Sequence, residues 1–204
     1  MIFDWISALY NIEGLIAWGG LAIICLIVFA ETGLFFGFFL PGDSLLITAG
    51  ILSAAGVLNV WYLLLFVSIC AIAGDQTGYL IGHKMGRLLF RKEDSLIFHP
   101  EHIAKAKAFY DKHGPKTIVL ARFVPIIRTF APPVAGAAKM EYRKFVSYNV
   151  IGGILWVFST VLGGYFLGRL IPNLEKYLYL IIGIVIVLSF LPIIIEIYKH
   201  RKKK

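Results

Sequence analysis

Apolar residues fill most of the chain in long runs that short polar segments separate. The sequence contains six such runs, at 15–40 (with Glu31 inside it), 44–58, 60–82, 117–138, 145–170 and 177–198. A helix needs about 20 apolar residues to cross a hydrocarbon layer of about 30 Å. The runs 60–82, 145–170 and 177–198 reach this length and are predicted to be full transmembrane helices. Because helices satisfy their own backbone hydrogen bonds in lipid, the pattern predicts an all-α polytopic membrane protein.

Composition excludes a soluble domain. Of the 204 residues, 59% are hydrophobic and 16% charged, and the mean hydropathy is +0.80. One soluble core of this size could not bury so much apolar surface. The net charge of +8 would indicate nucleic acid on a soluble chain, but here the basic residues gather between the apolar runs. This placement is typical of a cytoplasmic membrane face, so we expect no nucleic-acid partner.

Two regions contain residues that interrupt a transmembrane helix. Residues 41–43 read Pro-Gly-Asp, a turn signal between the first two runs, and the run 117–138 holds three prolines. We predict a re-entrant helical hairpin at 15–58 and a second one at 117–138, each entering and leaving the membrane on one side. The residues expected to break these hairpins are Pro41, Gly42, Pro125, Pro132 and Pro133.

The distribution of basic residues favours the second hairpin. If 117–138 is re-entrant, the segments 83–116, 139–144 and 199–204 share one face, which carries 16 of the 20 Lys and Arg against 2 opposite. A full crossing would divide them 10 against 8. The positive-inside rule therefore predicts a cell-membrane protein with these segments and the C-terminus cytoplasmic, and the N-terminus outside. For the first pair of runs, charge does not distinguish a hairpin from two crossings.

An internal repeat supports paired hairpins. A shift of 86 positions aligns residues 49–82 with 135–168 and gives seven identities in 34 positions, including two Gly-Tyr-x-x-Gly segments, 78–82 and 164–168. The aligned spans cross in opposite directions in this topology, which makes an inverted repeat. We expect the hairpins to face each other, with their tips near the bilayer midplane.

The whole chain is predicted to form a single membrane domain. Its expected parts are a first repeat (10–82, with hairpin 15–58 and span 60–82), a basic cytoplasmic connector (83–116), a second repeat (117–170), a final span (177–198) and a basic tail (199–204). Within the connector, Pro100 and Gly114 mark the start and end of a short helix. That helix either lies on anionic lipid or is a solvated link, and the sequence leaves both open.

Five ionisable residues lie in the apolar part of the chain and away from the ends of the three full spans: Glu31, Asp43, Asp75, Arg122 and Arg128. Each costs about 2.5 to 3.5 kcal/mol at a helix centre, so they must pair or face water. In a structural interpretation, Glu31 or Asp43 forms an ion pair with an arginine and holds the hairpins together. In a functional interpretation, the two guanidinium groups bind phosphate and the acids balance charge or couple protons. Asp75, a possible secondary site residue, lies within two turns of the cytoplasmic end of its span. Whether it is an interfacial helix residue bonded to a neighbour or has a functional role stays open.

The sequence predicts no metal site, no cofactor and no enzymatic activity. All five histidines fall in the expected cytoplasmic segments, and only His99 and His102 have a spacing that could suit a metal. No histidine lies near the arginine hairpin, and no Asp-rich metal motif is present. A phosphatase or phosphotransferase would need such a group or a nucleophile.

Four motifs between residues 31 and 136 form one recognisable pattern, and the match runs over about residues 10–170. They are Glu31, Pro41-Gly42-Asp43, Gly74-Asp75-x-x-Gly78-Tyr79-x-x-Gly82, and Arg122-Phe123-x-Pro125-x-x-Arg128-Thr129 through Ala135-Gly136. Together they resemble the signatures of the DedA family, also called SNARE-associated or VTT-domain proteins. The resemblance implies paired re-entrant hairpins and movement of phospholipids or undecaprenyl phosphate between leaflets, with dependence on the proton-motive force. It also implies essential roles for Glu31, Asp43, Arg122 and Arg128.

The expected function is therefore that of a lipid translocase. Arg122 and Arg128 are expected to hold the phosphate of undecaprenyl phosphate or a glycerophospholipid, while Glu31 and Asp43 couple protons or balance charge. A proton-coupled antiporter of a small ion or solute is the alternative, since buried charges and an inverted repeat would serve it equally well. The expected partners are membrane lipids and protons. The sequence does not define an oligomeric state.

Overall fold

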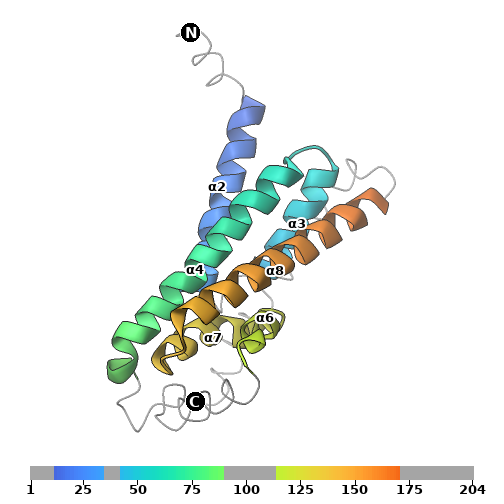
Figure 1. The fold of residues 1–204 in the computed structure, drawn as a ribbon. Coiled ribbons are helices and arrows are strands. Elements are labelled where there is room, and N and C mark those ends of the chain that lie inside the picture. Colours follow the sequence, from blue (N-terminus) through green and yellow to red (C-terminus); the bar gives the residue numbers. More distant parts are fainter. Residues whose placement is uncertain (1–11, 35–41, 90–113, 171–204) are drawn as a thin grey trace, which may run out of the picture. The chain divides into compact units, whose positions relative to one another are not determined.

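The computed structural model describes residues 12–34, 42–89 and 114–170. Within these ranges the chain forms helices and no strand. The helices are α2 (Ile12–Gly33), α3 (Gly42–Ala54), α4 (Val60–Leu89), α6 (Lys116–Ala121), α7 (Pro125–Ala137) and α8 (Tyr142–Leu170) (Figure 1). The prediction of an all-helical fold is confirmed for this part of the chain. The predicted final span 177–198, the connector helix and the basic tail lie outside the described residues.

The helices fall into two compact units, and each unit is described by itself. The first unit comprises residues 1–27, 41–67 and 160–204, and the second comprises 28–40 and 68–159. The long helices α2, α4 and α8 contribute residues to both units. Four of the five ionisable residues from the apolar part of the chain belong to the second unit, and Asp43 belongs to the first.

Within the residues that the structure describes, two helices are long and apolar enough to cross a membrane. They are the 26 residues Val60–Met85 of α4 and the 29 residues Tyr142–Leu170 of α8. The sequence predicted a span ending at residue 82, but α4 continues to Leu89 because no proline interrupts the segment that follows. The first turns of the predicted connector are therefore an extension of α4.

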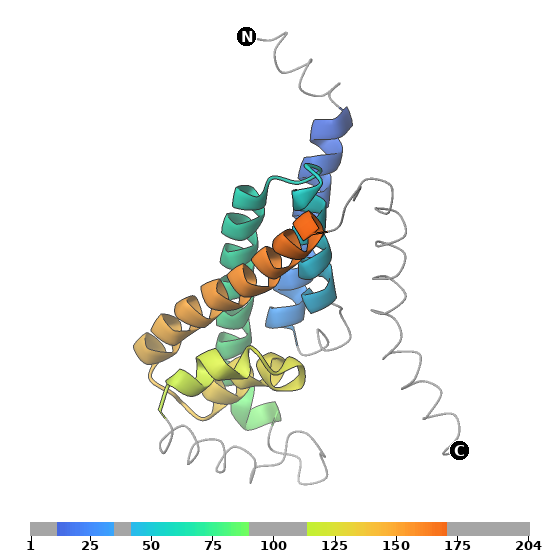
Figure 2. The same ribbon diagram turned by 90° about the vertical axis from the view of Figure 1, so that its right-hand side faces the viewer.

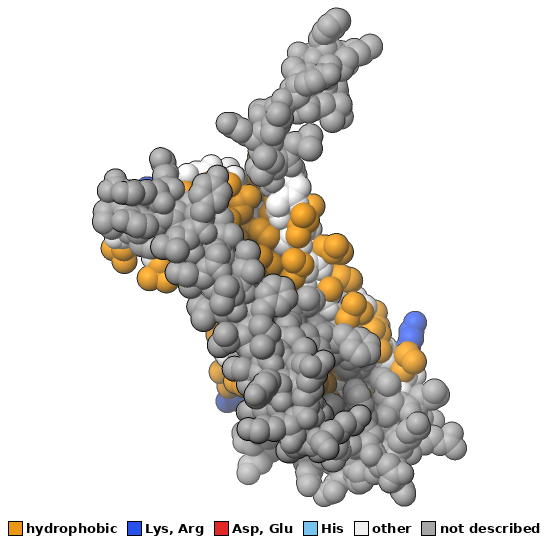
Figure 3. Space-filling model, turned by 180° about the vertical axis from the view of Figure 1, so that it is seen from behind, with side chains coloured by type: hydrophobic (Ala, Val, Ile, Leu, Met, Phe, Trp, Pro, Cys, Tyr) orange, Lys and Arg blue, Asp and Glu red, His pale blue; other side chains and the backbone are white. Residues whose placement is uncertain are grey.

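The surfaces of α4 and α8 carry large exposed hydrophobic side chains. Trp61 and Leu65 on α4 are 71% and 55% exposed, and Phe166 and Leu167 on α8 are 58% and 53% exposed. On the face seen in Figure 3, the described side chains are mostly hydrophobic. Because lipid tails solvate such side chains, these surfaces suit a membrane.

The run 117–138 is interrupted, as its composition predicts, between α6 and α7. The two short helices meet at a bend (Figure 2). Val124 before the bend is extended, with φ −111° and ψ 108°, the conformation favoured before a proline. Pro125 then occupies the first turn of α7, where its missing N–H costs no helical hydrogen bond.

Two of the expected hairpin breakers do not break a helix. Pro132 and Pro133 lie inside α7, so the prediction that they interrupt the hairpin is wrong. Pro133 packs against the face of α4 that carries Gly78 and Gly82. A Cβ on Gly78 would lie 3.4 Å from the Cδ of Pro133. This packing stabilises a helix that has lost two backbone donors to proline.

Glycines bring the short helices α7 and α3 close to long helices. In the second unit, a Cβ on Gly82 would overlap the backbone of Pro133, and one on Gly136 would overlap the carbonyl of Tyr79. In the first unit, a Cβ on Gly164 would overlap the backbone of Ile47. Both Gly-Tyr-x-x-Gly segments therefore serve as surfaces on which a short helix packs, α7 on α4 and α3 on α8.

We expect the substitution Gly82→Ala to lower the stability of the protein. The added methyl group meets main-chain atoms of α7 that cannot rotate away, and overpacking of this kind costs about 1 to 3 kcal/mol. The matched control is Gly163→Ala on α8, because nothing lies within 4 Å of a Cβ at Gly163. Thermal unfolding in detergent measures both. Equal unfolding midpoints for the two variants would contradict the close packing of α4 and α7.

Tyr79 joins α4 to the segment that links α7 and α8 in the second unit. Its hydroxyl donates a hydrogen bond to the carbonyl of Met140, 2.5 Å away. Its ring stacks on Phe145 with 4.4 Å between ring centroids, in a buried cluster that includes Ile118 and Ala135. This cluster fixes α6 and α7 against α4 and α8.

Candidate functional site

Two buried arginines lie on either side of the bend between α6 and α7. Arg122 directly follows α6 and Arg128 stands in the first turn of α7, and their side chains are only 4% and 8% exposed. Both guanidinium groups lie against α8, that of Arg122 beside Gly153 and that of Arg128 beside the ring of Trp156. Two buried cations in one place require anionic partners.

Arg128 is paired with a carboxylate from α2. Its Nη2 donates to the Oε1 of Glu31, whose side chain is 2% exposed. The guanidinium carbon also lies 4.9 Å from the ring centroid of Trp156 on α8, a cation–π arrangement. The sequence predicted that Glu31 or Asp43 pairs with one of the arginines, and Glu31 with Arg128 is the pair that the structure places in the second unit.

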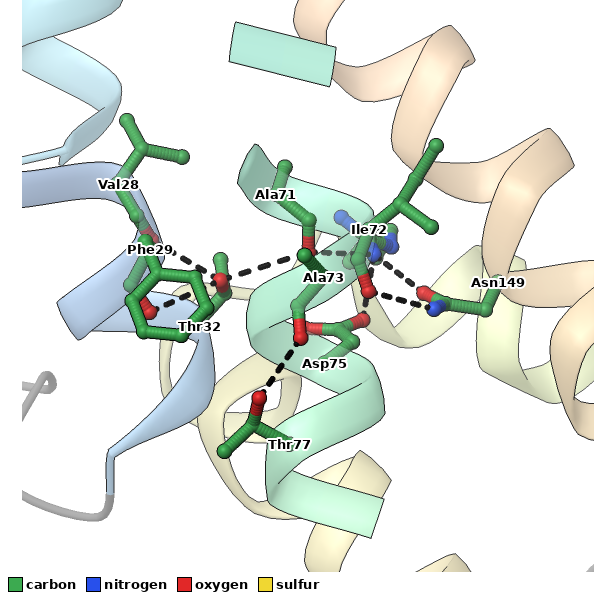
Figure 4. Close-up of polar contacts among 10 residues, drawn as sticks. Val28, Phe29, Thr32, Ala71, Ile72, Ala73, Asp75, Thr77 and Asn149 are labelled. Carbon is green, nitrogen blue, oxygen red and sulfur yellow. Dashed lines mark hydrogen bonds and ion pairs between the residues drawn. The ribbon is translucent and has the colours of Figure 1, made fainter. Parts of the chain in front are cut away.

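Glu31 is held in position by a close contact between α2 and α4. The hydroxyl of the adjacent Thr32 donates to the carbonyl of Val28 at 2.9 Å and faces the carbonyl of Ala71 at 3.4 Å (Figure 4). A Cβ on Gly33 would lie 3.0 Å from the carbonyl oxygen of Gly74. Because a Cβ on either glycine would crowd the other helix, glycine at 33 and 74 lets the two helices approach.

Arg122 is paired with Asp75, the acid whose role the sequence left open. Its Nη2 donates to the Oδ2 of Asp75 at 2.5 Å and to the Oδ1 of Asn149. The amide of Asn149 in turn donates to the carbonyl of Ile72 at 3.1 Å (Figure 4). Both Asp75 and Asn149 are buried, at 3% and 0% exposure. Asp75 is therefore the buried ion-pair partner of Arg122.

The guanidinium of Arg122 keeps one donor unused within the described residues. Its buried Nε has no hydrogen-bond partner there. An unmet buried donor costs about 1 to 3 kcal/mol, more when the group is charged. An oxygen of a bound anion at this edge would remove that cost.

The charges of the two buried ion pairs balance. Glu31 and Asp75 supply two negative charges against the two positive charges of Arg122 and Arg128. An incoming anion would add negative charge to a buried and neutral group of residues. Binding is therefore favoured when a carboxylate becomes protonated or leaves its arginine.

Asp43 lies in the first unit, where it stands in the first turn of α3. There its carboxylate interacts favourably with the N-terminal end of the helix dipole. Its predicted place beside the arginines stays a prediction. In the described part of the chain, no group of three or more His, Cys, Asp and Glu residues is arranged to hold a metal ion.

Asn149 and Trp156 each contact an arginine, although neither is among the site residues that the sequence predicted. The signal that could have found them is a spacing on α8: Asn149, Gly152, Gly153 and Trp156 fall at positions i, i+3, i+4 and i+7 of one helix. A polar residue and two glycines on one stripe of an apolar span are typical of close helix packing around a polar group.

Comparison with known proteins gives relatives over most of the chain. The family profile of the VTT domain matches residues 40–166. The chain is 50% identical over 183 residues to protein DedA of Escherichia coli K12, covering 89% of this chain and 83% of that protein. It is 44% identical over 187 residues to an uncharacterized membrane protein of Mycobacterium leprae, covering 90% and 82%. It is 32% identical over 157 residues to inner membrane protein YqjA of Escherichia coli K12, covering 76% and 70%. No solved structure gives a significant match.

Proposed function

This chain belongs to the DedA family of VTT-domain membrane proteins, and from that premise we propose that it moves a phosphate-bearing lipid between the two leaflets. The cargo is undecaprenyl phosphate or a glycerophospholipid. The observation that carries the proposal is the buried pair of arginines at the bend of a broken helix, with an unused donor on Arg122.

Phosphate is the anion that best fits this pair. A guanidinium is planar, stays charged when buried and offers parallel N–H donors to two phosphate oxygens. Arg122 is fixed through one nitrogen, which leaves its Nε edge for a ligand oxygen. The Glu31 carboxylate accepts a hydrogen bond from Arg128, and a phosphate oxygen that displaced this carboxylate would accept the same bond.

A lipid cargo fits the surroundings of the site. The arginines lie on short helices interrupted by a bend, next to long helices with exposed apolar surfaces. In the proposed path the headgroup passes the hairpins while the acyl or prenyl chain remains in the bilayer. The recurrence of the glycine contact between a short and a long helix in both units supports the inverted repeat on which this path depends.

Protons enter the mechanism through charge balance. When phosphate binds, Glu31 leaves Arg128 and takes up a proton, so the buried site does not gain uncompensated negative charge. Asp43, on the other hairpin, is proposed to do the same at a second step. Acidity outside then promotes loading from the outer leaflet, and the neutral cytoplasm promotes release.

Reconstitution of the full-length protein in vesicles tests the proposal. Leaflet exchange of undecaprenyl phosphate and of phosphatidylglycerol is followed with and without a pH gradient. We expect protein-dependent exchange that a gradient accelerates. Uptake of a small solute or ion without lipid exchange would replace the proposal by the antiporter, and release of inorganic phosphate from the lipid would replace it by an enzyme.

The proposed orientation in the membrane makes a separate prediction. We place residue 59 and the N-terminus outside, and residues 83–116, 139–144 and the C-terminus in the cytoplasm, by the positive-inside rule. Single cysteines introduced at 59 and 141 should react with an impermeant thiol reagent from opposite faces, in a chain whose Cys25 and Cys70 have been replaced. Labelling of both positions from one face would contradict the second hairpin.

A further inference from the structure

One stripe of α8 contacts both buried arginines. The stripe consists of Asn149, Gly152, Gly153 and Trp156, which lie on one helix face because their spacing follows the helical repeat. Asn149 accepts a hydrogen bond from Arg122, and Trp156 lies under the guanidinium of Arg128. A single rigid element therefore contacts two side chains that belong to two other helical segments.

The two glycines give the Arg122 side chain its place against the helix. A Cβ on Gly152 would lie 3.1 Å from the Cδ of Arg122 and 3.1 Å from the Cα of Val119. A Cβ on Gly153 would lie 3.4 Å from the Cζ of Arg122 and 2.8 Å from a side-chain carbon of Ile72. An alanine at 152 would crowd the stem of Arg122 and the backbone of Val119, whereas an alanine at 153 would crowd Ile72 and come into ordinary contact with the guanidinium.

Asn149 helps to determine which nitrogen of Arg122 forms hydrogen bonds within the protein. Its Nδ2 is bound to the carbonyl of Ile72, so its Oδ1 is turned to the arginine. Together with Asp75 it engages only Nη2, and the buried Nε stays without a partner among the described residues. The orientation leaves an unsatisfied and buried donor edge, which is the feature of a prepared anion site.

We propose that the stripe Asn149, Gly152, Gly153 and Trp156 is a cradle that fixes Arg122 and Arg128 in the arrangement that binds one phosphate group. This inference rests on the proposed function and deepens it. Asn149 and Trp156 are positioning residues, because each acts on the ligand through an arginine. The two glycines provide the space that the arrangement requires.

The cradle implies a defined pattern of affinities for phosphate. Gly152→Ala, which displaces the stem of Arg122, lowers affinity about tenfold, a loss of the size of one charge-assisted hydrogen bond. Asn149→Asp adds a third carboxylate to the site and lowers affinity at least about tenfold. Trp156→Leu removes the ring beneath Arg128 and lowers affinity about fivefold to tenfold, whereas Trp156→Phe retains most of it.

Calorimetric titration of the full-length protein in detergent tests these affinities. Two probes separate the sources of the phosphate: water-soluble dihexanoyl phosphatidic acid presents it as a lipid headgroup, and inorganic phosphate presents it free. The control is Gly163→Ala on the same helix, where nothing lies within 4 Å of the added carbon. In reconstituted vesicles the same substitutions should raise the apparent KM for lipid while the maximal exchange rate stays within about twofold. A merely structural role would lower the amount of folded protein instead.

The outcomes distinguish this inference from the function on which it rests. Wild-type protein that binds neither probe overturns the proposed function and the cradle with it. If wild-type protein binds a probe and Gly152→Ala and Trp156→Leu bind it equally tightly, the cradle is overturned but the proposed function is not. If Asn149→Asp does not fold, the comparisons of Gly152→Ala with Gly163→Ala and of Trp156→Phe with Trp156→Leu still decide. Weaker binding of a probe by Gly152→Ala and by Trp156→Leu supports the cradle for that probe, provided that Gly163→Ala binds like wild type and Trp156→Phe retains most of the affinity.

Discussion

Replacing Arg128 with lysine is expected to lower lipid-phosphate exchange by about tenfold to a hundredfold, while the protein still folds. Lysine keeps the positive charge opposite Glu31 but has a single compact donor group, which cannot bind two phosphate oxygens in parallel. Loss of one charge-assisted bond of about 1.5 to 3 kcal/mol accounts for a reduction of this size. The lysine also loses the planar face that lies against Trp156. Arg122→Lys is expected to behave similarly, since only Nη2 of Arg122 is held by the protein.

Arg169→Lys is the matched control for both substitutions. Arg169 is an exposed arginine on α8 that also faces an aromatic ring, with 5.4 Å from its guanidinium carbon to the ring centroid of Tyr165. Lipid-phosphate exchange should be unaffected by Arg169→Lys. Full activity of Arg122→Lys and of Arg128→Lys would leave generic positive charge as the only requirement, and the arginine pairs would then be structural ion pairs.

Replacing the two acids with neutral, isosteric amides is expected to uncouple lipid exchange from the pH gradient. Glu31→Gln and Asp43→Asn keep the shape of each side chain but cannot titrate. In the proposed mechanism Glu31 takes up a proton when phosphate displaces it from Arg128, so the glutamine variant binds headgroups without responding to the gradient. Exchange rates measured with and without a gradient should become equal in each variant.

Truncation of Glu31 has a different expected result from its neutral replacement. Glu31→Ala leaves the buried Arg128 without this carboxylate, and breaking a buried ion pair in this way costs about 3 to 5 kcal/mol. Glu141→Gln, at an exposed surface ion pair with Lys144, is the control and should change neither stability nor coupling. Gradient-driven exchange that persists in Glu31→Gln and Asp43→Asn would refute proton coupling through these acids. Wild-type exchange that ignores the gradient would identify a passive scramblase.

The sequence was sufficient to predict the features that follow from length, polarity and proline. Runs of about 20 apolar residues predicted the long helices α4 and α8, and the prolines of 117–138 predicted an interruption. The rule that proline breaks a helix did not predict at which proline the interruption lies. Pro125 fits the first turn of α7, but Pro132 and Pro133 lie within it because the contact with the glycines of α4 stabilises the helix.

Partner choice in the site depends on tertiary packing, which the sequence pattern does not encode. The cost of burying charge predicted that the acids and arginines pair, but not that Asp75 is the partner of Arg122. Asp75 and Arg122 are 47 positions apart, and Arg128 and Glu31 are 97 apart. Asn149 and Trp156 were missed because their spacing with Gly152 and Gly153 indicates close packing around a polar group but does not identify that group until the arginines beside it are known.

Photolabelling with a lipid phosphate most directly tests the central claim, that the buried arginines receive the phosphate of a lipid. The probe is a phosphatidic acid analogue with a diazirine beside the headgroup, and the matched probe is the corresponding diacylglycerol without phosphate. After irradiation of the full-length protein in vesicles, mass spectrometry maps the labelled residues. The account predicts labelling at residues 118–132 and around Asn149 by the phosphate probe alone, suppressed by excess undecaprenyl phosphate or phosphatidic acid. Identical labelling by both probes, confined to the exposed apolar surfaces of α4 and α8, would contradict it.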